Sequence, residues 1–320
     1  MSLTMRQNIS NYYARMFWLI LALILPFSVH GQTAQSKTEI SQNAAQTKSA
    51  VNIQNLKLNS KLMAREMPYR VVFPVGYENN KSEKHAVVYL LHGLTGHFDN
   101  WSDRTKLSDY TANYKYIIVM PEGNNGWYSD SATVPNDKYE SYIVKELIPE
   151  IDKNYRTISD RNSRVIAGLS MGGYGSLKFG LKYPEMFSLV GSFSGALQAA
   201  SFTDKILGNG WKVLTDSVMS VYGAEDSATR RENDIYKITR ELSAEKIKNL
   251  PFFYFDCGTE DGLIGSNRDF ASLLLEKKIP HEFRQLPGKH DWIFWNSQIK
   301  EFLELVELKT QTKAQTAKAN

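Results

Sequence analysis

The feature that most constrains the fold of this 320-residue chain is a set of short apolar runs separated by longer segments with helical periodicity. In the middle of the chain these runs are apolar on consecutive residues, which is typical of strands covered on both faces. They are HAVVYLLHG, YIIVMPEG, SRVIAGLS, FSLVGSFSG and FFYFDCG, at 85–93, 116–123, 163–170, 187–195 and 252–258. Strands that alternate with helices predict an α/β fold with a mostly parallel, doubly wound sheet and helices on both faces.

Other segments complete this predicted fold. The runs at 51–60 and 69–77 alternate apolar and polar residues, which indicates antiparallel strands at an edge of the sheet. A last strand is expected at 281–288. Helices are expected where apolar residues recur at helical spacing, in the segments 139–155, 267–279 and 296–308. In such a sheet, ligand sites gather at the carboxyl ends of the strands.

The beginning of the chain does not belong to this pattern. Arg6 and Arg15 precede an apolar run, Met16–Val29, and small residues follow near Gly31, so a secretory signal peptide is expected at 1–31. An uncleaved N-terminal anchor is the alternative, although the run is short for a membrane span. A cleaved signal would make the protein secreted or periplasmic, with no stable membrane span.

Polar segments without periodicity flank the predicted domain. Residues 32–50 indicate a linker and residues 309–320 a disordered tail. The stretch between them, 51–308, has the length of one α/β domain. Within it, about 198–250 is long for a connection and carries aromatic residues amid charges. This insertion predicts either a cap over the acyl pocket or helices packed on the sheet.

Composition limits the classes of function. The formal charge of +4 is small and its lysines and arginines are scattered, so no nucleic-acid surface is expected. Cys257 is the single cysteine, which excludes an internal disulfide, and its apolar surroundings indicate a buried small hydrophobe. No His, Cys and carboxylate residues stand at metal-ligand spacing, so neither a metal nor another cofactor is expected.

The segment GLSMGG, at 168–173, places a serine between two glycines where a buried strand gives way to a helix. This is the setting of a nucleophile elbow, in which a strained turn lifts the serine Oγ above the sheet. Gly168 and Gly172 fit there because side chains at these positions would collide where strand and helix approach. An ordinary glycine-rich turn is the alternative, so the role of Ser170 depends on its partners.

A serine nucleophile needs a base, and two histidines, His281 and His290, follow Ser170 in the chain. Hydrolases with this elbow have the chain order serine, acid, histidine. His281 begins the last predicted strand and so lies at the amino edge of the sheet, whereas His290 follows the carboxyl end of that strand. We therefore expect His290 to be the base.

The third member must orient this imidazole and stabilise its charged form. Asp256, Glu260 and Asp261 are the candidates. Asp256 falls within a strand, where an unpaired carboxylate is costly to bury. Asp261 lies in the loop between that strand and the next helix, which suits the role, and Glu260 is its main rival.

An acyl-transfer site also needs donors for the oxyanion. The backbone N–H of Met171, next after the serine, is one candidate. The other is the N–H of Leu94, in a loop where Gly93 permits close approach. His92, in the same loop, is expected to be a structural hydrogen-bonding residue.

These segments together resemble the "putative esterase" family of α/β-hydrolases, which includes S-formylglutathione hydrolases, tributyrin-type carboxylesterases, feruloyl and acetylxylan esterases, and the antigen 85 mycolyltransferases. The resemblance covers roughly Tyr69 to Leu305. It rests on the segments LLHGLTGHFDNW, YIIVMPEG, YIVKELIPEIDKNYRTISDR, AGLSMGGYGSLKFGLKYPEMF, CGTEDGLI and GKHDWIFW. It implies an α/β-hydrolase fold, with Ser170, Asp261 and His290 as the triad and with Leu94 and Met171 forming the oxyanion hole.

Three aromatic residues are candidates for contact with the substrate. Trp127 and Tyr128 follow the carboxyl end of a predicted strand, so they are expected near the mouth of the site, where they would stack on an aryl acid or a sugar. Local packing is the alternative for both, and Trp101 has the same two interpretations.

Three classes of function remain. The first is a secreted serine carboxylesterase that hydrolyses short-chain or aryl (feruloyl or acetyl) esters, in small molecules or on plant polysaccharide. The second uses the same triad differently, as an acyltransferase of the antigen 85 type that moves an acyl group to a sugar hydroxyl, or as a thioesterase similar to S-formylglutathione hydrolase. The third is a non-catalytic carbohydrate-binding module on a hydrolase scaffold.

Overall fold

The computed structural model describes residues 51–203, 205 and 212–319, which all lie in one compact unit, Lys48–Asn320. The expected signal peptide at 1–31 and the expected linker at 32–50 lie outside the described residues. None of the helices in the described part of the chain is both long and apolar enough to span a membrane.

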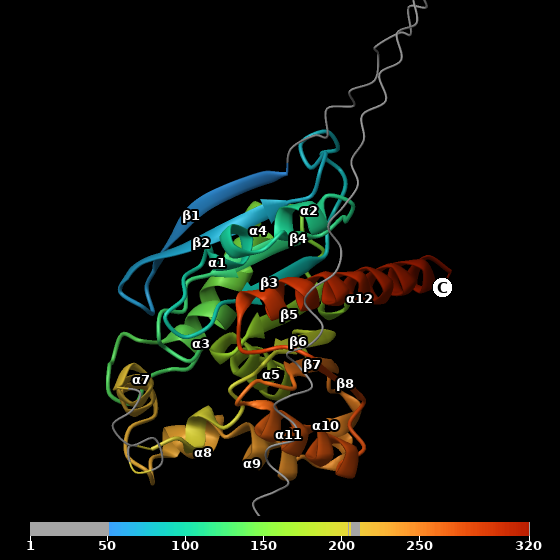
Figure 1. Ribbon diagram of the computed structural model, residues 1–320. Coiled ribbons are helices and arrows are strands. Elements are labelled where there is room, and N and C mark those ends of the chain that lie inside the picture. Colours follow the sequence, from blue (N-terminus) through green and yellow to red (C-terminus); the bar gives the residue numbers. More distant parts are fainter. Residues whose placement is uncertain (1–50, 204, 206–211, 320) are drawn as a thin grey trace, which may run out of the picture. The chain divides into compact units, whose positions relative to one another are not determined.

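The described strands form one eight-stranded sheet in the order β1-β2-β4-β3-β5-β6-β7-β8 (Figure 1). Their bounds are β1 (Asn52–Ser60), β2 (Arg65–Phe73), β3 (Val87–Leu91), β4 (Ile117–Pro121), β5 (Arg164–Leu169), β6 (Leu189–Phe193), β7 (Phe252–Gly258) and β8 (His281–Leu286). Strands β3 to β8 pair in parallel, whereas β1 and β2 are antiparallel and form one edge. The predicted doubly wound α/β sheet and its antiparallel edge are confirmed.

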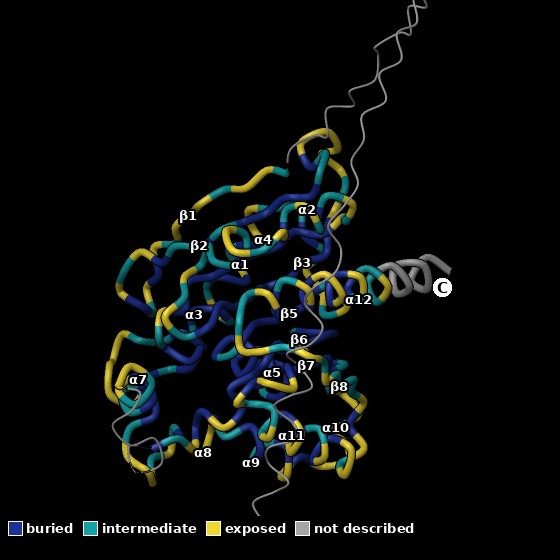
Figure 2. The backbone as a smooth tube through the Cα atoms, in the orientation of Figure 1, coloured by how far each residue is buried: buried dark blue, intermediate teal, exposed yellow. Residues whose placement is uncertain are grey.

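Every residue of the four central strands, β3, β4, β5 and β6, is buried, because helices cover both faces of the sheet (Figure 2). Alternate residues of one strand accordingly enter two separate apolar clusters. In β3, Val87, Tyr89 and Leu91 join one cluster, and Val88 and Leu90 join the other. This two-sided burial explains why these strands are apolar on consecutive residues.

The helices divide between the two faces. One cluster takes apolar residues from α3, α4 and α5, and the other takes them from α1, α2 and α12. The helical elements are α1 (Asn100–Arg104), α2 (Leu107–Thr111), α3 (Tyr139–Tyr142), a π-helical turn (Ile143–Leu147), α4 (Ile148–Asn154), a 3₁₀ turn (Arg161–Ser163), α5 (Met171–Lys182), a 3₁₀ turn (Ala199–Ser201), α7 (Lys212–Tyr222), α8 (Ala228–Asn233), α9 (Ile235–Arg240), α10 (Ala244–Lys248), α11 (Ile264–Glu276) and α12 (Trp292–Ala319). Helix α5 is buried over Met171–Leu181, because it runs between the sheet and α9.

Two segments differ from their sequence-based expectation in extent. The predicted helix at 139–155 contains a π-helical turn in its middle. Helix α12 continues through Ala319, so the segment at 309–320 that was expected to be disordered is helical up to that residue. Lysine, glutamine and alanine dominate this end of α12 and are strong helix formers, which accounts for the extension.

The segment from 198 to 250 contributes helices to the core. Tyr174 of α5 donates a hydrogen bond to the carbonyl of Asn233, and Tyr236 of α9 packs edge to face on Phe270 of α11. Helix α7 instead contacts the loop after β4, since Trp127 Nε1 donates to the hydroxyl of Ser217 at 3.0 Å. Helix α9 therefore packs among the helices of one face, and α7 lies beside the loop that follows β4.

Candidate active site

Ser170 stands at the junction of β5 and α5 in a strained conformation. Its φ of 52° and ψ of −113° lie in a region that residues other than glycine rarely adopt. A Cβ on Gly168 would lie 2.6 Å from the backbone of Gly172. A Cβ on Gly172 would lie 2.6 Å from the carbonyl oxygens of Leu91 and His92. Only glycine fits at both positions, as the sequence pattern predicts.

Backbone hydrogen bonds hold this turn in place. The N–H of Ser170 donates to the carbonyl of Phe193 at 2.9 Å, which ties the turn to the end of β6. The carbonyl of Ser170 accepts from the N–H groups of Tyr174 and Ala196, each at 3.0 Å. The strain at Ser170 is thus opposed by three hydrogen bonds, and the side chain remains half-buried at the carboxyl edge of the sheet.

His290, in the loop after β8, connects the serine to a carboxylate. Its Nε2 lies 3.0 Å from Ser170 Oγ, and its Nδ1 lies 2.8 Å from Asp261 Oδ2. An ionised carboxylate only accepts hydrogen bonds, so Nδ1 carries the proton and Nε2 accepts from the serine hydroxyl. The side chain of His290 is 36% exposed, which leaves the imidazole open to a ligand at the site.

Asp261 lies in the loop between β7 and α11, with its side chain 1% exposed. Its Oδ1 accepts from the N–H of Leu263 at 2.8 Å. Burial raises the pKa of this carboxyl, but the hydrogen bonds from His290 and Leu263 outweigh burial, so the pKa lies below its ordinary value. The carboxyl is therefore ionised at neutral pH and stabilises a positive charge on the imidazole.

Two loops far apart in sequence must meet to form this pair. The N–H of Thr259 donates to the carbonyl of Leu286 at 2.8 Å, and the N–H of Glu260 donates to that of Gly288 at 2.9 Å. Gly288 has a φ of +154°, and a Cβ there would collide with Phe294. These contacts fasten the loop of Asp261 to the loop of His290.

The rival residues lie elsewhere. The Glu260 side chain is 60% exposed and faces Lys289 at 3.8 Å. Asp256 is fully buried in β7, where it accepts a hydrogen bond from Tyr254, and burial raises its pKa well above the ordinary value. His281 begins β8 and contacts the carbonyl of Ile279. None of these three side chains has a hydrogen bond to His290 or Ser170 within the described part of the chain.

The loop that contains Leu94 and the first turn of α5, which begins at Met171, lie on either side of the serine in sequence and approach it in space. Met171 is the first residue of α5, and a Cβ on Gly93 would lie 3.5 Å from the Cβ of Ser170, so the loop of Leu94 approaches the serine closely. Among the described residues, no hydrogen bond joins either N–H to a protein acceptor. Both donors remain available for a ligand atom.

A buried carboxylate behind this loop was not predicted. Glu122, just after β4, accepts from the N–H of Asn124 at 2.6 Å and of Phe98 at 3.4 Å, and it contacts the ring nitrogens of His92 and His97 at 3.0 and 3.2 Å. Burial raises the pKa of Glu122, but these partners, His92 first, lower it to about 2. Glu122 thus fastens the loop that contains Leu94 to the end of β4. His92 is part of this framework, as expected.

The three aromatic residues expected at the mouth of the site are instead buried in the core. Trp127, Tyr128 and Trp101 are exposed by only 1%, 0% and 1%. Trp127 and Tyr128 have left-handed φ angles of 50° and 51°, which turn both side chains into the core. The Tyr128 hydroxyl donates to the carbonyl of His92, and the Trp101 indole donates to that of Leu91. Their packing excludes direct stacking on a substrate in this structure.

Trp295, for which the sequence predicts no role in the site, packs edge to face against the imidazole of His290. Cys257 is buried as expected, and burial raises the pKa of its thiol to about 12. Among the described residues, no three His, Cys, Asp or Glu side chains are grouped as metal ligands would be.

Comparison with known proteins places these residues in a family. The family model described as "Putative esterase" matches residues 60–305. An acetyl esterase of Caldicellulosiruptor saccharolyticus is 29% identical over 264 residues, which cover 79% of this chain and 97% of that protein.

Two further proteins are similar. An esterase of Mycobacterium tuberculosis is 32% identical over 237 residues, which cover 69% of this chain, and this chain spans about half of its length, 51%. A solved ferulic acid esterase is 29% identical, with a TM-score of 0.69, over 82% of this chain and 99% of that one. The α/β-hydrolase fold is therefore confirmed.

Proposed function

The chain belongs to this esterase family and is a carboxylic ester hydrolase, and we propose that Ser170 is its nucleophile, His290 its general base and Asp261 the carboxylate that orients the imidazole. One observation carries the proposal. The three side chains form a continuous hydrogen-bonded series, with 2.8 Å between Asp261 and His290 and 3.0 Å between His290 and Ser170. Such a series is what nucleophile activation requires.

The reaction follows from this geometry. His290 Nε2 takes the hydroxyl proton of Ser170 while Oγ forms a bond to the ester carbonyl carbon, and the carbonyl electron pair moves to its oxygen. The N–H groups of Leu94 and Met171 hold that oxyanion. When the pair returns, the C–O bond to the alcohol breaks and His290 gives the alcohol its proton. Water, deprotonated by His290, then releases the acid and restores Ser170.

The substrate belongs to the same proposal. We infer short-chain or aryl esters, acetyl or feruloyl, with plant polysaccharide as one source. The support is the likeness to an acetyl esterase and to a ferulic acid esterase, each at 29% identity. Export through a signal peptide at 1–31 fits a polymeric substrate that stays outside the cell.

A hydrolysis profile tests the proposal. The protein beginning at Gln32 is assayed with p-nitrophenyl acetate, butyrate and octanoate, with methyl ferulate and with acetylated xylan. Turnover of acetyl or feruloyl esters, and its loss in Ser170→Ala with an unchanged melting temperature, is the expected result. Substantial turnover by Ser170→Ala would overturn the assignment of the nucleophile. Acyl transfer to an added sugar, in preference to hydrolysis, would instead favour the transferase.

A further inference from the structure

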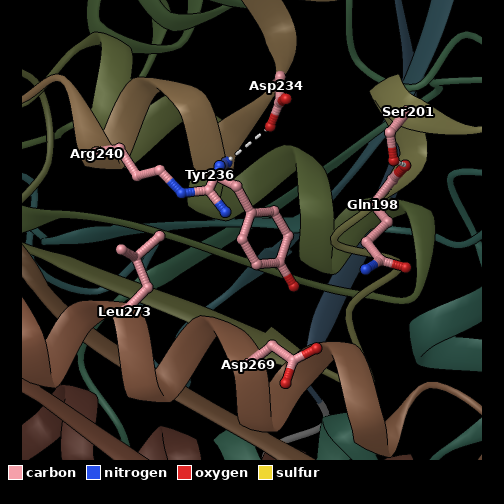
Figure 3. Close-up of a pocket in the computed structure, with 7 residues that line it drawn as sticks. All are labelled: Gln198, Ser201, Asp234, Tyr236, Arg240, Asp269 and Leu273. Atoms are coloured by element: carbon pink, nitrogen blue, oxygen red, sulfur yellow. Dashed lines mark hydrogen bonds between the residues drawn. The ribbon is translucent and has the colours of Figure 1, made fainter.

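Among the cavities lined by described residues, two are polar and lie outside the triad. The larger, with a volume of about 640 Å³, lies between the loop after β4 and helix α7, and the start of β2 closes one side. The smaller, about 380 Å³, lies between the 3₁₀ turn at Ala199–Ser201, α9 and α11 (Figure 3). Both volumes fall in the range of small-molecule sites, roughly 300–1,000 Å³. The two cavities differ in their connection to the loop that contains Leu94.

One hydrogen bond connects the larger cavity to the loop that contains Leu94. Asn125 lines the cavity, and its Oδ1 accepts a hydrogen bond from the N–H of Thr95 at 2.8 Å. Thr95 directly follows Leu94, whose N–H we assign to the oxyanion. Thr95 and Asn124 have left-handed φ angles of 61° and 40°, a local strain of the kind that gathers at functional sites. A ligand in this cavity therefore lies against the wall that positions an oxyanion donor.

The lining of the larger cavity mixes hydrogen-bond donors with acceptors. Arg65 uses Nη2 to bind Asp137 at 2.8 Å and the Tyr139 hydroxyl at 3.0 Å, and Asn124 Nδ2 donates to the same hydroxyl at 2.7 Å. Within the described part of the chain, no hydrogen bond is made by Arg65 Nε and Nη1, Asn124 Oδ1, Asn125 Nδ2 or the Ser220 hydroxyl. Hydroxyl groups, which donate and accept at once, match this mixture.

The charged residues that line the larger cavity have no excess of positive charge, since Arg65 is accompanied by Asp137 and Asp216. Asp137 pairs with Arg65, and Asp216 pairs at 2.6 Å with Lys212, which lies outside the lining. A lining of this kind gives a phosphate or carboxylate no surplus of positive charge. It suits a neutral ligand rich in hydroxyl groups.

We propose that this cavity, the Arg65–Asn125–Ser220 cavity, is a subsite for a neutral saccharide unit of the ester substrate. The inference rests on the proposed function of Ser170, because the saccharide is taken to belong to the same substrate molecule whose ester group Ser170 attacks. Asn125 links the subsite to Thr95, so saccharide binding and the position of the Leu94 N–H depend on one side chain.

The smaller cavity provides a matched control. Its Arg240 lies over the ring of Tyr236 at 5.7 Å, as Arg65 lies over Tyr139 at 5.6 Å. Figure 3 shows Arg240 and Tyr236 side by side, and Asp234 bonded to the backbone N–H of Tyr236 at the start of α9. The Tyr236 hydroxyl is bound to a carbonyl of α11. Among the described residues, no hydrogen bond joins the lining groups of the smaller cavity to the loop of Leu94.

Two variants test the subsite by different means. Arg65→Met removes the donors while keeping an apolar stem, and Ser220→Phe fills the cavity while leaving the backbone contacts of Ser220 in place. Each should raise KM for acetylated xylo-oligosaccharides by about ten-fold, the effect of losing one strong hydrogen bond. Their kcat/KM for p-nitrophenyl acetate should stay within about two-fold of wild type, because this substrate has no sugar. Arg240→Met should change neither value.

Binding without turnover separates this proposal from that for Ser170. Saturation-transfer NMR with unacetylated xylotetraose should give a signal with wild type, Ser170→Ala and Arg240→Met, and none with Arg65→Met or Ser220→Phe. Melting temperatures confirm that the variants fold. A saccharide signal that persists in both cavity variants, or an equal fall in turnover of both substrates, would overturn the subsite. Saccharide binding by a protein that hydrolyses no ester would refute the catalytic proposal alone.

Discussion

The indole of Trp295 meets the imidazole of His290 edge to face, with ring centroids 4.9 Å apart and ring planes at 88°. Trp295 is buried at the start of α12, and its ring also packs edge to face with that of Trp292, with ring centroids 5.3 Å apart. The imidazole therefore has Asp261 at one nitrogen, Ser170 at the other and a rigid ring against it. Packing of this kind fixes the ring orientation that proton transfer requires.

Trp295→Ala should lower both activity and stability. Removing a buried aromatic side chain costs about 3–5 kcal/mol of unfolding free energy, measured by urea denaturation. Freed from this wall, His290 should lose alignment, and kcat/KM should fall by about ten-fold or more even well below the melting temperature. Trp295→Phe keeps an aromatic edge and should stay within a few-fold of wild type. An Ala variant with full activity would show that Asp261 alone suffices to orient the imidazole.

Asp261→Asn and Glu260→Gln should separate the two neighbouring acids. Asn at 261 still reaches His290 Nδ1 but favours the wrong tautomer, so kcat should fall by about 10⁴-fold, as in other serine triads. Glu260→Gln should remain within about two-fold, because the side chain of Glu260 faces solvent. Single-turnover kinetics with p-nitrophenyl acetate measure both. The reverse ranking would assign the orienting role to Glu260.

Gly172→Ala tests the close approach at the elbow. Its Cβ would lie 2.6 Å from two backbone carbonyl oxygens, those of Leu91 and His92, which cannot move without disturbing β3. The expected loss is about 3 kcal/mol or more of unfolding free energy, as for other strongly overpacked sites. Gly265→Ala is the control, since nothing lies within 4 Å of a Cβ there and helix propensity should add about 0.5–1 kcal/mol. Chemical denaturation compares the two variants, and a Gly172→Ala protein of normal stability would contradict the steric argument.

Much of this architecture is readable from sequence because it depends on local pattern. Runs such as YIIVMPEG are apolar on consecutive residues because both faces of β4 are covered, and the run alone predicts that. Ser170, Asp261 and His290 are likewise selected by their order in the chain and by their position after the end of a predicted strand. Both properties can be determined from the sequence alone.

The features that were missed depend on conformation or on distant partners. Trp127 and Tyr128 follow a strand end, as an exposed pair would, but their left-handed φ angles turn them into the core. Glu122 resembles an ordinary loop acid in sequence. Its burial is tolerated because the backbone N–H groups of Asn124 and of Phe98, 24 residues away, donate hydrogen bonds to it. Neither the φ angles nor these contacts can be deduced from spacing.

Glu122 should make the stability of the protein depend on pH. Its pKa falls from an ordinary 4.5 to about 2 in the folded chain, so the ionised form is favoured by folding. The corresponding stabilisation, on the order of 3 kcal/mol, is fully present above pH 4.5 and is lost as the pH falls towards about 2.

Glu122→Gln should therefore lower the unfolding free energy at pH 7 and flatten its decline between pH 5 and pH 2, measured by urea denaturation at each pH. Glu276→Gln, at the exposed end of α11, should leave both unchanged. Because Glu122 accepts from the N–H of Phe98 and so fastens the loop of Leu94, Glu122→Gln should also reduce kcat at neutral pH. A variant with the wild-type pH slope would mean that other buried carboxylates, such as Glu140, dominate the acid response.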